Sequence, residues 1–296
     1  MSQIDLVYRI IAIIFPVFSI VAIGYIYARR RHDTDMSSGN RLNMDIFTPA
    51  LIFDYMSGSD YALADYLYLS LGCVFVVLGS GLIAWPVARL LGFQWKTLVP
   101  PMMFNNCGNM GLPLVVLTFG EAMLPAAILL LAISNFFHFL VGQQLITQHW
   151  SPKAVVTNPM ILATLLGIAV SVSGIEIPET LRQPIHMLGL ISIPLMLFSL
   201  GVRMIAIDFR DWKISVVGSL LCPLSGLVIA LPFVLLVPLS QEQASLLVLF
   251  SVLPPAVLNF IVAERYGQEP HRVASIVLVG NLSSVLVIPI TLWFIL

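Results

Sequence analysis

The sequence predicts an all-α integral membrane protein with ten transmembrane helices arranged in two inverted five-helix repeats. Three observations support this fold class: the composition, the spacing of the apolar runs, and a pair of proline-containing interruptions. Of the 296 residues, 59% are hydrophobic and 10% are charged, and the mean hydropathy is +0.98. Soluble proteins carry roughly 25% charged residues. A soluble domain could not bury this much apolar surface, so the chain is predicted to lie in a membrane.

Apolar runs of roughly the 17–25 residues needed to cross the hydrocarbon core follow one another along the whole chain. We expect spans at residues 6–28, 42–57, 66–88, 97–118, 122–146, 156–174, 183–202, 214–237, 243–263 and 273–295. The second run is short, and the fourth and ninth are broken, so nine and eleven spans stay open as alternatives.

The positive charges fall on one side of this arrangement. Of the 14 Lys and Arg residues, only two lie on the other side: Arg9, near the outer end of the first span, and Arg182, in the loop after the sixth. The loops after odd-numbered spans hold the rest: Arg29, Arg30, Arg31, Arg41, Arg89, Lys96, Lys153, Arg203, Arg210, Lys213, Arg265 and Arg272. Because Lys and Arg concentrate in cytoplasmic loops, both termini are predicted on the extracytoplasmic side of a bacterial-type inner membrane. The first span reads as a retained helix and not as a cleaved signal.

Similar short patterns recur at about half the length of the chain. Phe15-Pro16 corresponds to Asn158-Pro159, the Pro49 segment to that of Pro194, the Pro100-Pro101 pair to Pro254-Pro255, and Asn135 to Asn281. We therefore divide the chain into two five-helix repeats, residues 1–149 and 150–296, with no separate soluble domain. Five is an odd number, so the second repeat enters the membrane from the opposite side, and the repeats are inverted.

The fourth and ninth spans each contain a proline pair followed by amide side chains. Prolines remove helical hydrogen bonds, and lipid-exposed backbone cannot tolerate that loss, whereas backbone lining a solute cavity can. Paired interruptions in two halves indicate the binding site of a secondary transporter. Restarted helices direct partly positive N-termini at such a site, which suits a carboxylate. The candidate substrate-binding residues are Asn105, Asn106, Gly108, Asn109, Pro255 and Asn259. The alternative is that the amides only bind backbone at two proline kinks.

Other polar residues within the spans are candidates for ion coupling. His138 and Asp45 are candidate proton sites, with a structural hydrogen bond and a helix cap as the respective alternatives. The three cysteines lie in apolar spans or at the first interruption, and they show neither a disulfide framework nor a metal-ligand spacing. We therefore expect no metal site and no cofactor.

The chain resembles the auxin efflux carrier family, that is, the bacterial relatives of the plant PIN-type auxin carriers. The resemblance rests on Asn106-Cys107-Gly108-Asn109-Met110-Gly111-Leu112-Pro113, on Leu253-Pro254-Pro255-Ala256-Val257-Leu258-Asn259-Phe260, and on Ala263-Glu264-Arg265-Tyr266. It implies that spans 4 and 9 cross at their breaks, that one helix bundle moves as an elevator, and that the protein is a homodimer. Asn106 matches a substrate-binding Asn of the family. Asn105 and Asn259 stand where plant members have prolines, which favours bacterial members resembling malate or malonate permeases.

The sequence therefore predicts a permease for a small organic anion in a lipid bilayer, with H⁺ or Na⁺ as coupling ions to consider. One alternative is a sodium-coupled symporter that resembles the bile-acid carriers. Another is a non-transporting membrane receptor or partner subunit. An enzyme is not expected, because the chain contains no His-Glu-x-x-His and no Gly-x-Ser-x-Gly. No feature indicates nucleic-acid binding.

Overall fold

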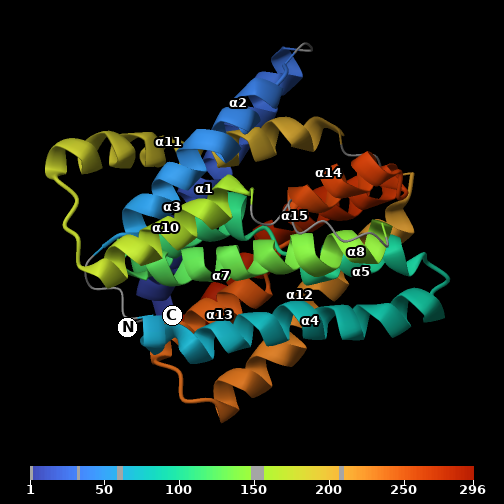
Figure 1. Cartoon of the computed structure of the whole chain (residues 1–296). Helices are drawn as coiled ribbons and strands as arrows, with labels where there is room; N and C mark the ends of the chain where they lie inside the picture. The colour runs from blue at the N-terminus through green and yellow to red at the C-terminus, as the bar shows by residue number, and fades with distance from the viewer. Residues whose placement is uncertain (1–2, 32–33, 59–62, 148–156, 207–209) are drawn as a thin grey trace.

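The computed structural model describes residues 3–31, 34–58, 63–147, 157–206 and 210–296, which are almost entirely helical (Figure 1). The α-helices are α1 (Gln3–Arg30), α2 (Ser37–Leu42), α3 (Thr48–Met56), α4 (Leu67–Leu90), α5 (Trp95–Met103), α6 (Leu112–Phe119), α7 (Leu124–Phe137), α8 (Gln143–Thr147), α10 (Pro159–Ser173), α11 (Glu179–Arg203), α12 (Trp212–Leu236), α13 (Gln241–Ser251), α14 (Val257–Tyr266) and α15 (Pro270–Ile295). Turns of π-helix at Asn43–Phe47, Cys107–Gly111 and His138–Gly142 continue into their neighbours, and 3₁₀ turns lie at Leu63–Tyr66, Glu121–Met123 and Met204–Ala206.

Six helical stretches among the described residues are long and apolar enough to cross a membrane. They are Gln3–Arg30, Leu67–Leu90, Glu121–Ile146, Glu179–Arg203, Trp212–Leu236 and Pro270–Ile295. Large apolar side chains stand exposed on their outer surfaces, among them Leu235 (82% exposed) and Phe294 (80% exposed). Soluble proteins do not expose such extensive apolar surface, whereas acyl chains would cover it. The chain is therefore a multi-pass, all-helical membrane protein.

The four remaining expected spans coincide with shorter helices. The span expected at 42–57 corresponds to a π-helical turn followed by α3, and the span at 156–174 corresponds to α10. The spans at 97–118 and 243–263 each correspond to two α-helices separated by other backbone. The assignment of ten spans in inverted repeats thus stays a prediction. Its boundary at residues 149 and 150 lies outside the described residues.

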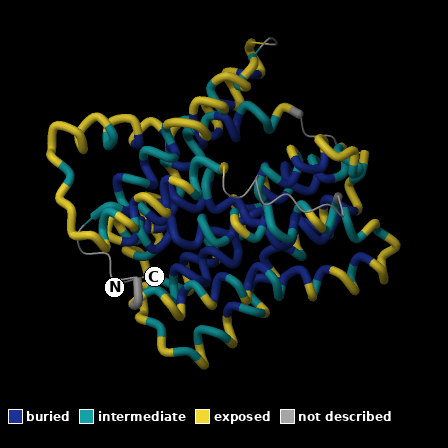
Figure 2. Tube along the Cα trace, in the orientation of Figure 1, coloured by how far each residue is buried: buried dark blue, intermediate teal, exposed yellow. Residues whose placement is uncertain are grey.

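The helices pack as two groups (Figure 1). On one side of the molecule α1 packs against α11, α11 against α3, and α3 against α10. Helices α4, α5, α12, α13 and α15 form the second group, with α7 packed against α4 and α14 against α15. Buried residues concentrate in the middle of the molecule, where both groups meet the interrupted segments (Figure 2). The core thus lies around the candidate site.

Local sequence accounts for several helix ends. The Asn158 side chain accepts hydrogen bonds from the N–H groups of Met160 and Ile161 at the start of α10. Ser240 and Gln243 form a reciprocal capping box at the start of α13. Gly174 and Gly267 end α10 and α14 with φ values of 67° and 68°, a backbone conformation that glycine adopts without strain.

Candidate functional site

Both predicted interruptions contain non-helical backbone. Helix α5 ends at Met103, and the π-helical turn that leads into α6 begins at Cys107. Helix α13 ends at Ser251, and α14 begins at Val257. The first proline pair lies inside α5, so that interruption follows the prolines and does not coincide with them. Proline fixes φ at a helical value and removes only its own N–H, which a short helix accommodates.

The two non-helical segments hydrogen-bond to each other. Asn106 donates its N–H to the carbonyl of Pro254 at 2.7 Å, and Ala256 donates its N–H to the carbonyl of Phe104 at 2.9 Å. Asn105 and Pro255 thereby form a single antiparallel β-bridge. Backbone groups away from water must be paired within the protein. This bridge provides part of that pairing for both segments at once.

Amide side chains add further hydrogen bonds around the bridge. Asn105 Nδ2 donates to the carbonyl of Phe250 at 2.9 Å, and Asn259 Nδ2 donates to the carbonyl of Phe104 at 3.0 Å. Asn106 Nδ2 donates to Oδ1 of Asn281 at 2.8 Å. Asn105 and Asn259 thus bind backbone carbonyls, and Asn106 binds the side chain of Asn281, while the role of all three toward a solute stays a prediction.

Asn281 and Cys222 also hold the bridge region. Asn281 accepts from Asn106 and donates from Nδ2 to the carbonyl of Pro255 at 3.0 Å, so its side chain joins both interrupted segments. Cys222 Sγ lies 3.5 Å from Oδ1 of Asn105 and 3.5 Å from the carbonyl of Leu253. Both residues are buried.

A cavity of about 120 Å³, the crossover cavity, lies beside the bridge. Four of the predicted substrate-binding residues line it: Asn105, Asn106, Gly108 and Asn109. Pro255 and Asn259 are not among the described residues that line it, although their neighbours Ala256, Val257 and Leu258 are.

Asparagine dominates the polar lining of the crossover cavity. The chain contains nine asparagines, and all except Asn259 and Asn281 line this cavity: Asn40, Asn43, Asn105, Asn106, Asn109, Asn135 and Asn158. Asparagine amides offer both donors and acceptors without charge. The site can thus donate hydrogen bonds to a polar solute and accept hydrogen bonds from it.

Several of these polar groups are free for a solute. Asn109 is partly exposed, and its side chain makes no hydrogen bond to another described residue. Asn43 is buried, and its Oδ1 lacks a partner among the described residues. The first residues of α14, Val257 and Leu258, also face the cavity, which places the positive end of that helix beside it.

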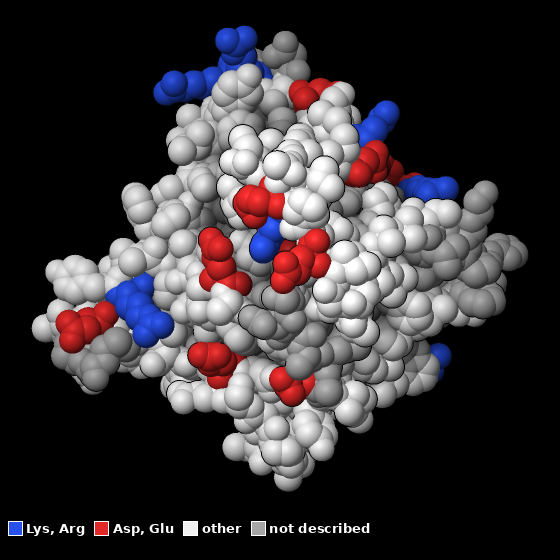
Figure 3. All heavy atoms as spheres, turned by 60° about the vertical axis from the view of Figure 1, so that its left-hand side comes forward, with Lys and Arg blue, Asp and Glu red and all other residues white. Residues whose placement is uncertain are grey.

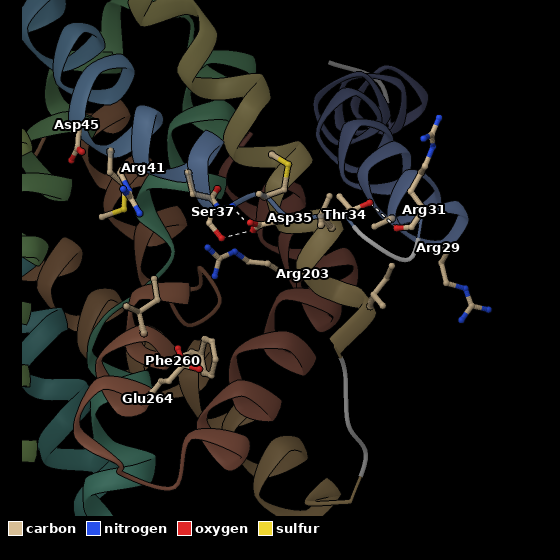
Figure 4. Close-up of a pocket in the computed structure, with 17 residues that line it drawn as sticks. Arg29, Arg31, Thr34, Asp35, Ser37, Arg41, Asp45, Arg203, Phe260 and Glu264 are labelled. Carbon is tan, nitrogen blue, oxygen red and sulfur yellow. Dashed lines mark hydrogen bonds between the residues drawn. The ribbon is translucent and has the colours of Figure 1, made fainter.

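A larger cavity of about 1010 Å³, the vestibule, adjoins the crossover cavity. The two cavities share Asn40, Met44, Arg203 and Ile261. Three acidic side chains and four arginines line the vestibule: Asp35, Asp45, Glu264, Arg29, Arg31, Arg41 and Arg203. Arg203, the last residue of α11, directs its side chain into the space between α2 and α14 (Figure 4). It is the one charged residue among the described residues that line the crossover cavity.

Hydrogen bonds between Asp35 and Ser37 hold the start of α2 beside the vestibule. Asp35 accepts a hydrogen bond from the N–H of Ser37 at 2.8 Å and another from the hydroxyl of Ser37. These hydrogen bonds lower the pKa of the Asp35 carboxyl below its ordinary value. Asp35 therefore stays ionised in the vestibule at neutral pH.

The two candidate coupling residues occupy different surroundings. His138 is buried, and its ring stacks on Phe104 with 4.2 Å between ring centroids. Asp45 is exposed in the wall of the vestibule. Neither lines the crossover cavity. Among the described residues, no group of three or more His, Cys, Asp and Glu side chains could hold a metal ion.

Sequence reasoning missed Arg203, Asn43 and Asn281 as site residues. The sequence places Arg203 among the loop charges, because it ends an apolar run, and it distinguishes Asn281 only by its place in the repeat. Asn43 carries no local signal, because it stands at the start of the span expected at 42–57, where a polar residue is common. Only the packing of α2, α11 and α14 around one space brings these residues together.

The fold and the cavities define a polytopic helical membrane protein with a polar, asparagine-rich recess at paired backbone interruptions, in which Arg203 is the one charged residue among the described lining residues. Comparison with known proteins places the chain more closely. Residues 9–152 and 145–293 match the family described as membrane transport protein, so the chain belongs to this family, that of the auxin efflux carriers. The sequence is also 25% identical to the "putative malonate transporter" of Rhizobium meliloti (strain 1021), over 94% of this chain and 93% of that protein. The protein is thus a membrane transporter and not an enzyme.

Proposed function

We propose that the protein is a secondary transporter of small organic anions, which it binds in the crossover cavity and moves by alternating access. The observation that carries this proposal is the concentration of seven of the nine asparagines around one cavity at the paired interruptions. Amide donors, the N-terminal end of α14 and the Arg203 guanidinium together favour an anion. The name of the Rhizobium relative supports a small dicarboxylate as the substrate.

The proposed membrane arrangement has ten spans in two inverted repeats, with interrupted spans 4 and 9. The vestibule lies among residues of the predicted cytoplasmic loops, including Arg29, Arg31 and Arg41. The opposite end of the molecule, where both termini lie in Figure 1, shows chiefly acidic side chains at the centre of its face in Figure 3. This distribution supports termini on the extracytoplasmic side of a bacterial inner membrane.

On that assignment the structure corresponds to an inward-facing state. The vestibule leads from the cytoplasmic side to the crossover cavity. Towards the outside, two contacts join the α1–α3–α10–α11 group to α6 and to the 3₁₀ turn that precedes α7. Tyr55 donates its hydroxyl hydrogen to Oε2 of Glu121 at 3.0 Å, and Arg9 donates to the carbonyl of Thr118 at 3.4 Å. Sliding of the α4–α5–α12–α13–α15 group against the α1–α3–α10–α11 group, as in an elevator, would open the cavity to the outside.

Several features of the transport cycle stay predictions. They are coupling to H⁺ through His138 or Asp45, coupling to Na⁺ as in the bile-acid carriers, and assembly as a homodimer. The alternative that the sequence left open, a receptor or partner subunit that binds the anion without moving it, is disfavoured by membership of a transporter family. Uptake of the anion into sealed vesicles separates a carrier from such a receptor.

Uptake of radiolabelled malonate into proteoliposomes tests the proposed function, and Asn109→Ala tests the site. We expect the purified protein to carry malonate. The substitution is expected to weaken apparent affinity about tenfold or more, because a hydrogen bond to a charged group is lost. Gln144→Ala on the exposed side of α8 is the matched control and should behave as the native protein. Equal uptake by Asn109→Ala and the control would remove this site assignment.

Tyr55→Phe is expected to shift the protein toward the outward-facing state, because it deletes the hydrogen bond to Glu121. The shift can be measured as faster labelling of a cysteine at position 109 by a membrane-impermeant maleimide added outside. The three native cysteines are buried and are kept, and the protein without Asn109→Cys gives the background labelling. Tyr68→Phe, which alters an exposed tyrosine on α4, is the control. An unchanged labelling rate in Tyr55→Phe would show that this contact does not close the outer side.

A further inference from the structure

We propose that Arg203 is the residue that binds the carboxylate of the substrate, and that Glu264 is the acid that competes with the substrate for it. This inference rests on the proposed transport of organic anions and identifies the group that selects for charge. It has three supports: the charge balance of the crossover cavity, the position of the Arg203 side chain, and the length of α14 beside it.

The charge balance of the crossover cavity favours an anion at one end. No Asp, Glu or His lies among the described residues that line it, so the charge of Arg203 is not balanced within the cavity. Asparagine amides can hydrogen-bond a solute but cannot neutralise a cation. A partly buried cation attracts an anion more strongly than a fully solvated cation does, because less water screens its charge.

The Arg203 side chain is available for that anion. It makes no direct ion pair with another described residue, although Glu264 on α14 interacts with it electrostatically. In Figure 4 its guanidinium lies in the opening between Ser37 and Phe260, away from the ribbon of α11. Asp35, the other acid drawn nearby, already accepts two hydrogen bonds from Ser37. Glu264 is therefore the acidic side chain best placed to pair with the Arg203 guanidinium when no substrate is bound.

The length of α14 fits a small solute between two positive ends. Val257 at the start of α14 lines the crossover cavity, and Ile261 lines the shared boundary together with Arg203. Four residues of α-helix span about 6 Å. A carboxylate on Arg203 would thus leave the far end of a three- or four-carbon solute beside the N-terminus of α14 and the amide of Asn109. Both of those groups donate hydrogen bonds.

Calorimetric titration of the purified full-length protein with malonate and with its monomethyl ester tests this role. We expect Arg203→Gln to weaken malonate binding about 30-fold or more, because one partner of a desolvated charge pair is removed. It should also reduce the preference for malonate over the ester. Arg41→Gln removes the same charge from the vestibule alone and is the matched control, expected within about threefold of the native protein.

Glu264→Gln gives a prediction of opposite sign. Removing the competing carboxylate should tighten malonate binding about two- to fivefold. Native-like malonate binding in Arg203→Gln, or weaker or unchanged binding in Glu264→Gln, would overturn the assignment. If Arg203→Gln does not fold, the Glu264→Gln titration decides alone. If the native protein carries malonate while Arg203→Gln binds it equally well, only the role of Arg203 fails. If the native protein neither binds nor carries carboxylates, both the role of Arg203 and the proposed function fail.

Discussion

Replacing Asn281 by leucine is expected to destabilise the protein and to abolish uptake. The side chain of Asn281 accepts a hydrogen bond from Asn106 at 2.8 Å and donates one to the carbonyl of Pro255 at 3.0 Å. Leucine is similar in size but can make neither bond. The substitution would leave two buried polar groups unpaired, each at a cost of about 1–3 kcal/mol. Because these groups belong to the two interrupted segments, the wall of the crossover cavity would lose its shape.

The measurement is thermal unfolding in detergent together with malonate uptake into proteoliposomes. A fall in Tm of about 5 °C or more is expected for Asn281→Leu. Asn135→Leu is the matched control, because Asn135 is the predicted counterpart of Asn281 in the first repeat. Its side chain has one contact among the described hydrogen bonds, 3.6 Å from Sδ of Met160. The control should lower substrate affinity while the Tm stays near the native value. Equal Tm values for the two variants would contradict the role given to Asn281.

The contrast between these two asparagines shows how far the sequence could lead. Proline and asparagine in the middle of apolar runs identified the interruptions, because these residue types are costly in lipid. The sequence could not separate amides that hold backbone from amides that face the solute. Asn105 and Asn106 are adjacent, yet one binds the carbonyl of Phe250 and the other binds Asn281. Their partners lie about half a chain away, and only the tertiary fold selects them.

The sequence also could not predict where α5 ends or which charged residue belongs to the site, again because both depend on the tertiary fold. The sequence favoured loss of helix at Pro100-Pro101, whereas α5 continues to Met103 and is interrupted where its backbone can pair with the second segment. Arg203 was correctly placed at the end of an apolar run. Its position at the boundary of two cavities depends on α2 and α14, which lie far from it in the sequence. Hydropathy and charge thus predict the membrane arrangement, while the composition of the site depends on packing.

The second large effect is expected from Gly201→Ala, which should separate α1 from α11 and displace Arg203. A Cβ atom at position 201 would lie 1.9 Å from the carbonyl oxygen of Val21 and 2.9 Å from the backbone nitrogen of Tyr25. A Cβ atom on Gly24 would likewise lie 2.2 Å from the carbonyl oxygen of Phe198. These are backbone atoms, so no side-chain rotation can relieve the overlap. Small residues permit such close helix approach in membranes, and here the two helices depend on it from both sides.

Gly39→Ala in α2 is the matched control, because an added Cβ there would lie 3.4 Å from the flexible end of Met36. That variant should keep the native Tm and native uptake. Gly201→Ala should lower the Tm and weaken malonate binding, since Arg203 follows only two residues later on α11. A variant with native Tm and affinity would show that α1 and α11 can separate without moving the site. Weaker malonate binding at a native Tm would instead show that the substitution acts through the position of Arg203. The close crossing of α1 and α11 would then be needed to place the Arg203 charge beside the solute, and not to stabilise the fold.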